Sequence, residues 1–423
     1  MSTATKQNNK NLFSLVFTVF LDFVGFGIVI PIIAPILLDP AHGILSQDVA
    51  YSTRTVTLGF LIASFTIAQF FGAPILGVLS DKYGRKKILL LSIIGTAVSL
   101  FLFGVGVEMK SIYLLFFSRI LNGVMGGNVS TAQSAVADMS DFKTKARNFG
   151  LIGMAFGLGF VLGPYLGGKL SDPNTVSWFN FSTPYWVASG LATINVFLIW
   201  LMFKETLLTP KQDAHISFLH GVRNIGKAFT KPHLRHIFIV TFLAIVGFSF
   251  FTQFYQVYLI DKFKYTQSDI GHLYAFIGIW IALTQGGLVR FLSHKTSPTH
   301  VVRVSLLTLS IGLFMLLIPQ QSYWIYFVLP IVAVSQGATT PNMNAMLSNL
   351  SSPQEQGEIM GINQSIASLG ISLPPMVAGF LSSIDIRLPL IMAGSFALLS
   401  WVVFITVFQK IHLKMDHSHV VNG

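Results

Sequence analysis

Long apolar runs, separated by short stretches of charge, glycine and proline, recur along the whole chain. Most runs reach the roughly 18 residues that a helix needs to cross about 30 Å of hydrocarbon. The pattern therefore predicts an all-α polytopic membrane protein with twelve transmembrane helices. We expect these helices near residues 12–38, 55–79, 88–107, 112–137, 148–170, 184–203, 235–260, 269–292, 301–318, 323–349, 358–383 and 387–409.

Composition supports this class and excludes others. The chain is 52% hydrophobic and only 10% charged, whereas soluble domains carry about 25% charged residues. It has no cysteine, which excludes disulfides, thiolate metal sites and cysteine nucleophiles. Its histidines lack metal-ligand spacing, and no Walker-type nucleotide loop occurs. We therefore expect no enzymatic activity, no metal and no cofactor, with a proton gradient as the energy source.

The distribution of positive charge predicts the topology. A net charge of +11 would suggest nucleic acid in a soluble protein, but in a polytopic protein the side of the membrane that holds the charge matters more. The expected helices place 20 of the 27 Lys and Arg residues on the side of the termini and 6 on the other side. Both termini should then be cytoplasmic, in a multi-pass protein of the bacterial inner membrane. Its expected partners are lipid, protons and a small-molecule substrate, without nucleic acid, and the expected state is a monomer.

The two halves of the chain repeat each other. Gly150-Leu151 recurs as Gly361-Ile362 and Pro164 recurs as Pro375, so helix five repeats as helix eleven. In the same comparison Asp22 stands opposite Ala244, so the ionisable residues remain in the first half. We expect a six-helix bundle over 1–203, a cytoplasmic linker over 204–234, a second bundle over 235–410 and a tail over 411–423.

The linker contains apolar residues at near-helical spacing, with Arg223 and Lys227 between them. This pattern predicts a surface helix that lies on the bilayer, and a plain tether is the alternative. The apolar residues are Ile216, Phe218, Leu219, Val222, Ile225 and Phe229.

Residues 77–87, here the 77–87 loop, form a tight turn between helices two and three. The glycines Gly77 and Gly84 suit close helix approach, and Asp81 can cap a helix N-terminus. Arg85 can bind a carboxylate through two N–H groups. An ordinary positive loop would explain the lysines of this segment but not the spacing of its Gly, Asp and Arg residues.

Two ionisable residues lie inside expected helices. Asp22 is the one acidic residue placed deep in a helix, and Arg119 lies in helix four before Gly123, Gly126 and Gly127. Such residues are costly in hydrocarbon unless they are paired or hydrated. A carboxyl group that alternates between wet and dry surroundings can load and release a proton. Asp22 and Arg119 are therefore our candidates for proton coupling, and a permanent structural salt bridge is the alternative.

Helix five and the second half supply the remaining candidates. Gly163, Pro164, Gly167 and Gly168 would let neighbouring helices approach closely and permit a kink, although glycine faces also occur in static bundles. In the second half, neutral amides among aromatic rings suit a bulky amphipathic solute better than a small anion, but each amide could instead bond a neighbouring helix. The amides are Gln253, Gln256, Gln285, Gln336, Asn342, Asn363 and Gln364, and the aromatic residues are Phe250, Phe254, Tyr255 and Trp280.

These motifs resemble those of the major facilitator superfamily. The 77–87 loop resembles its signature loop, the Arg119 segment its helix-four motif, and the Gly163-Pro164 segment the element that accompanies antiporters. Helix one, from Leu21 through Asp22 to Pro31, resembles the drug/proton antiporter branch, most closely the tetracycline/proton antiporters. In the second half the resemblance is weaker, because the loop from Arg290 to Lys295 lacks the Asp and the Gly-Arg pair.

The resemblance implies a major facilitator fold and proton-coupled export of a small amphipathic molecule by alternating access. A metabolite or siderophore carrier is the alternative within transport, and a non-transporting membrane sensor is the alternative outside it. Members of the family pair an acidic residue at the position of Asp138 with the loop arginine. If Asp138 meets Arg85 or Arg147, it would latch the inner gate in one state, and a solvated helix end is the alternative.

Overall fold

The computed structural model describes residues 3–42, 44–140, 145–207, 220–230, 234–293, 295–351 and 356–408. These residues are almost all helical and contain no strand. Within them, ten helices are long and apolar enough to cross a membrane. The expected helices four and ten are missing from this set. The first is broken into two short helices, and the second is long enough but polar in its C-terminal half.

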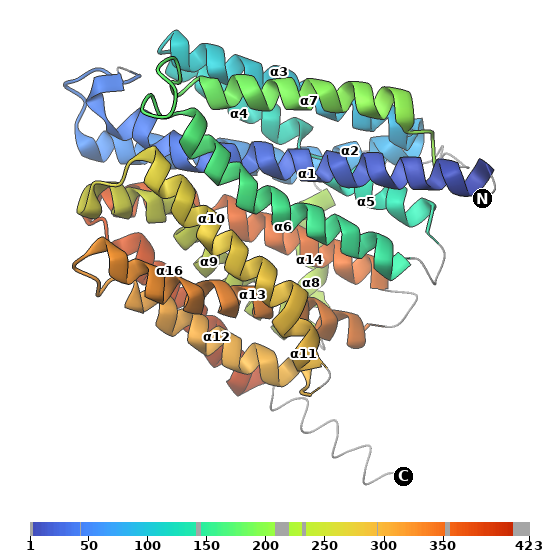
Figure 1. Cartoon of the computed structure of the whole chain (residues 1–423). Helices are drawn as coiled ribbons and strands as arrows, with labels where there is room; N and C mark the ends of the chain where they lie inside the picture. Colours follow the sequence, from blue (N-terminus) through green and yellow to red (C-terminus); the bar gives the residue numbers. More distant parts are fainter. Residues whose placement is uncertain are drawn as a thin grey trace. The chain divides into compact units, whose positions relative to one another are not determined.

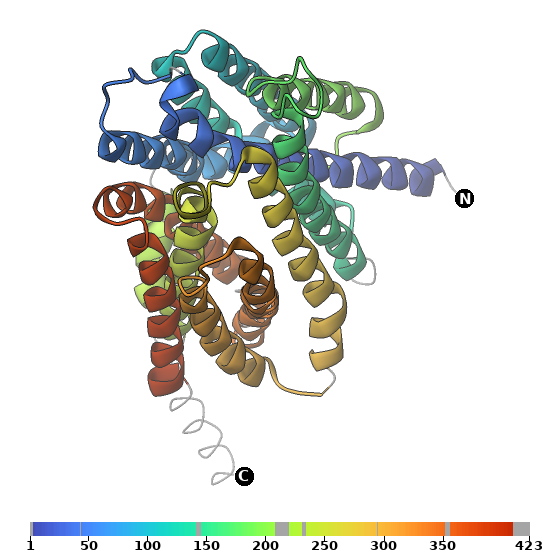
Figure 2. The ribbon, with the colours of Figure 1, turned by 60° about the vertical axis from the view of Figure 1, so that its left-hand side comes forward.

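Clustering of contacts divides the chain into two compact units, the first being Met1–His220 with Leu259–Ile279. In this unit α1 and α6 cross in contact, and α3 lies beside α7 (Figures 1 and 2). A buried cluster joins Leu15, Ile93, Ala132, Ile152 and Ile199 from five different helices. The helices are α1 Thr3–Leu38, α2 Tyr51–Tyr83, α3 Arg85–Glu108, α4 Ile112–Met125, α5 Asn128–Asp138, α6 Lys145–Leu170, α7 Thr183–Met202 and, up to residue 279, α10 Gln267–Leu283.

Several helices extend beyond their apolar runs into polar sequence. α1 begins at Thr3 rather than near residue 12 because its first turns bond to the segment after α7. The Nδ2 of Asn11 donates to the Lys204 carbonyl at 3.1 Å, and the Lys204 N–H donates back to Asn11 Oδ1 at 2.9 Å. Hydropathy alone gives the buried length of a helix, whereas polar contacts of this kind decide where it ends.

The expected single helix over 112–137 is broken at Gly126-Gly127, where α4 ends and α5 begins. Consecutive glycines weaken a helix because they add backbone freedom and no packing. Side chains of neighbouring helices donate hydrogen bonds to the backbone carbonyls at the break. Gln69 Nε2 donates to the Gly126 carbonyl at 3.2 Å, and the Ser92 hydroxyl donates to the Met125 carbonyl.

The second unit is Gly221–Tyr258 with Trp280–Gly423. Its core joins Phe238 of α9, Leu306 of α12, Met343 of α13, Ile362 of α14 and Phe404 after α16. Its helices are α8 His220–Thr230, α9 Arg235–Phe263, α11 Val289–Ser293, α12 Pro298–Met315, α13 Ile325–Asn349, α14 Gln356–Ser372, α15 Pro374–Ile384 and α16 Leu388–Val403 (Figure 1).

Helix eleven, expected as one helix over 358–383, is interrupted between α14 and α15. Two consecutive prolines, Pro374 and Pro375, remove two backbone donors there. α6 contains only Pro164 at the matching place and continues through it to Leu170. The helix is therefore continuous in the first repeat and interrupted in the second. The second repeat has one more proline at this position, which accounts for the interruption.

A helix does occur in the linker, at α8. Ile225 and Ala228 pack against the core of the second unit. Asn224 Nδ2 adds a hydrogen bond of 3.3 Å to the Ser365 hydroxyl on α14. The other predicted apolar positions, Ile216, Phe218, Leu219 and the side chains of Val222 and Phe229, lie outside the described residues.

Candidate functional site

Arg85, the first residue of α3, lies between two carboxylates. Its Nη1 is 2.6 Å from Asp81 Oδ1, and its Nε is 2.9 Å from Asp138 Oδ2. Nη1 also donates to the Ser80 hydroxyl at 2.6 Å. Asp138 ends α5, where the helix dipole disfavours negative charge. The buried guanidinium offsets that cost and joins the ends of α2, α3 and α5.

Gly84 allows the turn that makes this arrangement possible. Its φ of 100° lies in the left-handed region, where only glycine is unstrained. A Cβ there would also lie 2.6 Å from Glu205 Oε2. Gly77 behaves differently, because a Cβ at that position would have no neighbour within 4 Å. The interpretation of Gly77 as a close-approach position is therefore wrong for this conformation.

Glu205, three residues after α7, is the cap of α3. Its Oε1 accepts the Arg85 N–H at 2.9 Å, and its Oε2 accepts the Lys86 N–H at 3.0 Å. The Lys86 Nζ in turn donates to the Trp200 carbonyl at 2.8 Å. The interpretation of Asp81 as a helix cap does not hold for α3, because Asp81 lies in the last turn of α2 and binds the Arg85 side chain.

The sequence reasoning missed Glu205, although an acidic residue directly after helix six was visible. Nothing in the sequence connects it with residues 120 positions earlier. Arg147, the other candidate partner of Asp138, has a side chain outside the described residues. The structure thus brings together Asp81, Gly84, Arg85 and Asp138 and adds Glu205 to them.

Asp22 lies near the middle of α1, and the Asn128 side chain lies beside its carboxyl group. Asn128 is buried and is the first residue of α5. Its Oδ1 accepts the N–H of Val129 at 3.1 Å, which leaves the Nδ2 to face Asp22. The Asp22 oxygen Oδ2 is buried without a hydrogen-bond partner among the described residues. The helix break thus places both a donor and a helix N-terminus at this carboxyl.

Asn128 is a second residue that sequence reasoning missed. The signal that could have found it was the Gly126-Gly127 pair directly before it, because consecutive glycines mark a helix end. An amide at the start of the following helix can then point at a neighbouring helix. The identity of that neighbour, α1, follows only from the packing.

Arg119 occupies separate surroundings from Asp22. Its guanidinium lies 4.5 Å from the centroid of the Phe65 ring, a cation–π contact. Arg119 Nε and the Tyr185 hydroxyl are both buried without a hydrogen-bond partner among the described residues. Both ionisable residues lie in the described part of the chain, and no ion pair joins them there. The alternative of a permanent Asp22–Arg119 salt bridge is absent from this conformation.

The helix-five motif presses α6 against two other helices. A Cβ at Gly163 would lie 2.7 Å from the Val24 carbonyl oxygen, and one at Gly27 would lie 2.7 Å from Pro164 Cδ. Gly167 similarly meets the backbone of Ile28. On another side of α6, Gly168 meets the backbone of α10 at residues 267 and 271. The close α1–α6 contact begins within two residues of Asp22, so movement of one helix must involve the other.

The amides predicted to line a cavity have varied surroundings. Asn363 Nδ2 donates to Asn344 Oδ1 at 3.1 Å and so joins α14 to α13. Gln256, Gln336 and Asn342 bond within their own helices. Gln285 and Gln364 are exposed, and Gln253 is half-buried. Asn344, Thr340 and Ala338 are partners of these amides that the sequence analysis had not selected.

The predicted aromatic walls mostly belong to the core of the second unit. The three rings of α9 are almost fully buried, and Phe250 stacks on Phe396. Trp280 is half-buried. The other two buried rings of α9 are Phe254 and Tyr255. The structure therefore places these predicted wall residues in packing contacts.

Comparisons with known proteins agree with this architecture. The sequence model of the Major Facilitator Superfamily matches residues 15–344 and 288–417. Multidrug resistance protein 1 of Bacillus subtilis (strain 168) is 28% identical over 386 residues, which are 91% of this chain and 92% of that protein. The quinolone resistance protein NorA of Staphylococcus aureus (strain MSSA476) is 29% identical over 419 residues, 96% of this chain and 97% of that protein.

Solved structures show the same fold at lower identity. The crystal structure of the human organic anion transporter MFSD10 has a TM-score of 0.71 and 22% identity, covering 94% of this chain and 99% of that one. The crystal structure of a D-xylose-proton symporter has a TM-score of 0.72 and 16% identity, covering 94% and 98%. At these identities the likeness concerns the fold alone.

Proposed function

The chain belongs to the Major Facilitator Superfamily, and on this premise we propose that it exports a small amphipathic molecule in exchange for protons. It is a multi-pass membrane transporter, not an enzyme. The names of its relatives, multidrug and quinolone resistance proteins, support export of drug-like molecules. The proposal places both termini in the cytoplasm of a bacterial cell and treats 1–203 and 235–410 as the halves that alternate access, joined by 204–234 and followed by the tail 411–423.

The observation that carries the proposal is the placement of Asp22. It is a carboxyl group in the middle of a membrane-spanning helix, with the Asn128 amide beside it and its second oxygen, Oδ2, buried without a hydrogen-bond partner among the described residues. An acidic side chain at such a place is functional by default, because hydrocarbon makes it costly. We propose that the second oxygen takes up the proton when the cavity opens to water, and that Arg119 responds to the change in charge at a distance.

The cytoplasmic cluster of Asp81, Arg85, Asp138 and Glu205 serves as a latch in this scheme. Its ion pairs and backbone caps join the ends of α2, α3, α5 and α7. Two conformations of nearly equal free energy can be biased by about 1 kcal/mol. We assign the Gly163–Gly168 segment to the helix contacts that change during the cycle, and the seven amides from Gln253 to Gln364 to the substrate cavity.

The test uses the full chain in everted membrane vesicles that carry a pH-sensitive dye. Addition of a transported compound should collapse part of an imposed proton gradient, and dyes, antibiotics and iron chelates are screened in turn. Asp22→Asn should abolish this signal, whereas Asp48→Asn, a matched control at an exposed loop carboxyl, should retain it. Uphill export that persists after Asp22→Asn, or after a protonophore removes the gradient, would contradict the proposal.

A further inference from the structure

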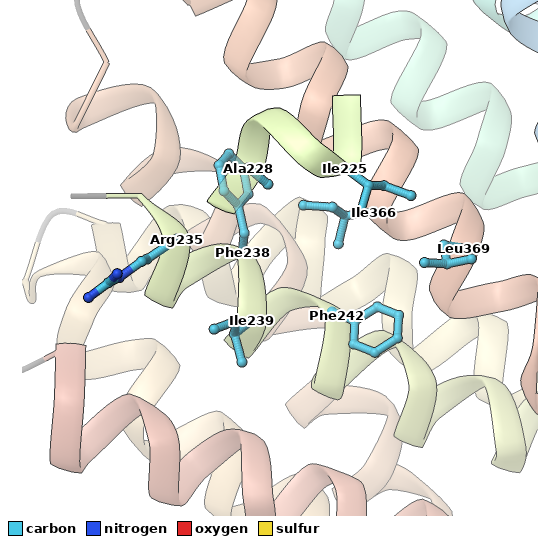
Figure 3. Close-up of a pocket in the computed structure, with 8 residues that line it drawn as sticks. All are labelled: Ile225, Ala228, Arg235, Phe238, Ile239, Phe242, Ile366 and Leu369. Carbon is cyan, nitrogen blue, oxygen red and sulfur yellow. The ribbon is translucent and has the colours of Figure 1, made fainter. Parts of the chain in front are cut away.

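The second unit contains an apolar groove between α8, α9 and α14 (Figure 3). It encloses about 110 Å³. Arg235, Phe238, Ile239 and Phe242 line it from α9, at positions that share one side of a helix. From residue 235 to residue 242 this side extends about 10 Å along α9.

The surface of the groove is almost entirely apolar, and a cationic side chain stands at one end with its head group pointing outward (Figure 3). Arg235, at the first residue of α9, is the single charged residue of the lining, and its side chain points away from Ile366 and Leu369 at the other end (Figure 3). The Arg235 side chain is exposed, and its Nε donates to His236 Nε2 at 3.3 Å. Its two Nη atoms form no hydrogen bond or ion pair with any residue in the described ranges, so they remain available for an anion.

The surrounding sequence strengthens this positive end. No Asp or Glu occurs between Asp213 and Asp261, whereas four Lys and Arg residues do. Arg223 and Lys227 lie on α8, the helix that forms one wall of the groove. Such a cluster, beside a membrane-spanning helix on the side rich in positive charge, attracts anionic head groups.

We propose that this groove binds an anionic phospholipid of the cytoplasmic leaflet, with an acyl chain along Phe238 and Phe242 and the phosphate at Arg235. The shape and the charge select this occupant together. A soluble phosphate would leave the apolar walls unused, and a cationic solute would meet Arg235 at the open end. The membrane supplies chains of the required length directly at the first turn of α9.

The lipid has a structural consequence for the linker. Ile225 and Ala228 of α8 form one wall, and Ile366 and Leu369 of α14 form another. A direct polar contact of these helices is the 3.3 Å bond from Asn224 to Ser365. An acyl chain between the walls would add apolar contacts to both and hold α8 on the bundle. This effect depends on the membrane topology and not on the identity of the exported molecule.

The test measures thermal unfolding of the full chain in detergent, with increasing phosphatidylglycerol or with phosphatidylcholine of the same acyl chains. Phosphatidylglycerol should raise the unfolding midpoint, whereas phosphatidylcholine should have little effect. Arg235→Gln should weaken binding and so raise the half-maximal concentration of phosphatidylglycerol about fivefold. Leu369→Trp, which fills the groove, should remove the effect. Arg303→Gln is the matched control, because Arg303 is an exposed arginine outside the groove.

Three results would overturn the proposal. Equal stabilisation by phosphatidylcholine would remove the role of the head group. An equal loss of phosphatidylglycerol binding in Arg303→Gln would mean that the lipid is attracted to positive charge in general and not to this groove. The same shift with glycerol phosphate alone would mean an anion site without an acyl chain. Native mass spectrometry of the retained lipid gives a second measurement: one phosphatidylglycerol should remain on the wild type and be lost from Arg235→Gln.

Discussion

Arg85 and Asp138 form an ion pair of 2.9 Å between the first residue of α3 and the last residue of α5. They are 53 positions apart in the sequence. Asp81 binds the same guanidinium at 2.6 Å, so the two carboxylates share this cation. Removal of either carboxylate leaves Arg85 with the other, and this dependence makes the pair open to a double-mutant test.

We expect Asp81→Asn and Asp138→Asn each to change turnover more than substrate affinity. The cluster lies at a helix-end turn, and its loss shifts a conformational balance by about 1 kcal/mol. Because both act through Arg85, the double variant should be little worse than either single one. Transport rates in proteoliposomes, measured over a range of substrate concentrations, check this. Fully additive losses would contradict the shared role, and a large change in KM would place either residue in the binding site.

Glu205→Gln should lower the thermal stability, because the amide keeps only part of the cap on the Arg85 and Lys86 N–H groups. Loss of a helix cap costs about 1 kcal/mol. Gly84→Ala should cost more, since it adds left-handed strain and displaces Glu205 Oε2. Thermal unfolding in detergent measures both. Glu108→Gln, at the other end of α3, is the control, and an equal loss there would argue against a special role for Glu205.

Asn128 should act as a positioning residue for Asp22. Asn128→Ala removes both the amide beside Asp22 and the acceptor of the Val129 N–H, whereas Asn128→Ser keeps a hydroxyl acceptor at the start of α5 but is too short to replace the amide. Loss of a hydrogen bond to a charged group corresponds to about a tenfold effect. We therefore expect both variants to reduce proton-driven transport about tenfold with KM unchanged. Wild-type activity of Asn128→Ser would mean that the residue serves only as a cap.

Asp22→Asn should abolish uphill transport and leave part of the energy-independent exchange. The amide has almost the same size as the carboxyl group but cannot exchange a proton with water, so the cycle should lose its coupling while the cavity remains. Counterflow of a labelled compound in proteoliposomes measures exchange, and everted vesicles measure uphill transport. Loss of both activities in a folded variant would assign Asp22 to substrate binding instead.

Arg119→Lys should fail as completely as Arg119→Ala. Lysine keeps the charge but loses the planar group that lies over Phe65. Phe65→Leu should then share part of the defect, because it removes the ring and leaves the arginine. Near-normal transport by the lysine variant would mean that positive charge alone is required at this position.

The sequence by itself identified ten segments that the described structure also shows as helices long and apolar enough to cross a membrane. In hydrocarbon each segment must satisfy its backbone hydrogen bonds internally, so a long apolar run has few structures open to it other than a helix. The same reasoning identified Asp22 and Arg119, because an ionisable residue in such a run stands out without any knowledge of its neighbours. The family motifs, which are short and local, were equally visible.

Only the tertiary structure decided which of these residues meet. The Glu205 cap on α3 joins residues 120 positions apart, and no local pattern records such a distance. The break at Gly126-Gly127 and the contact of Asn128 with Asp22 depend on how α5 packs against α1. Hydrophobic burial is non-directional and can be read along the chain, whereas hydrogen bonds and ion pairs are directional and require positions in space. For this reason the helices followed from the sequence and their polar partners did not.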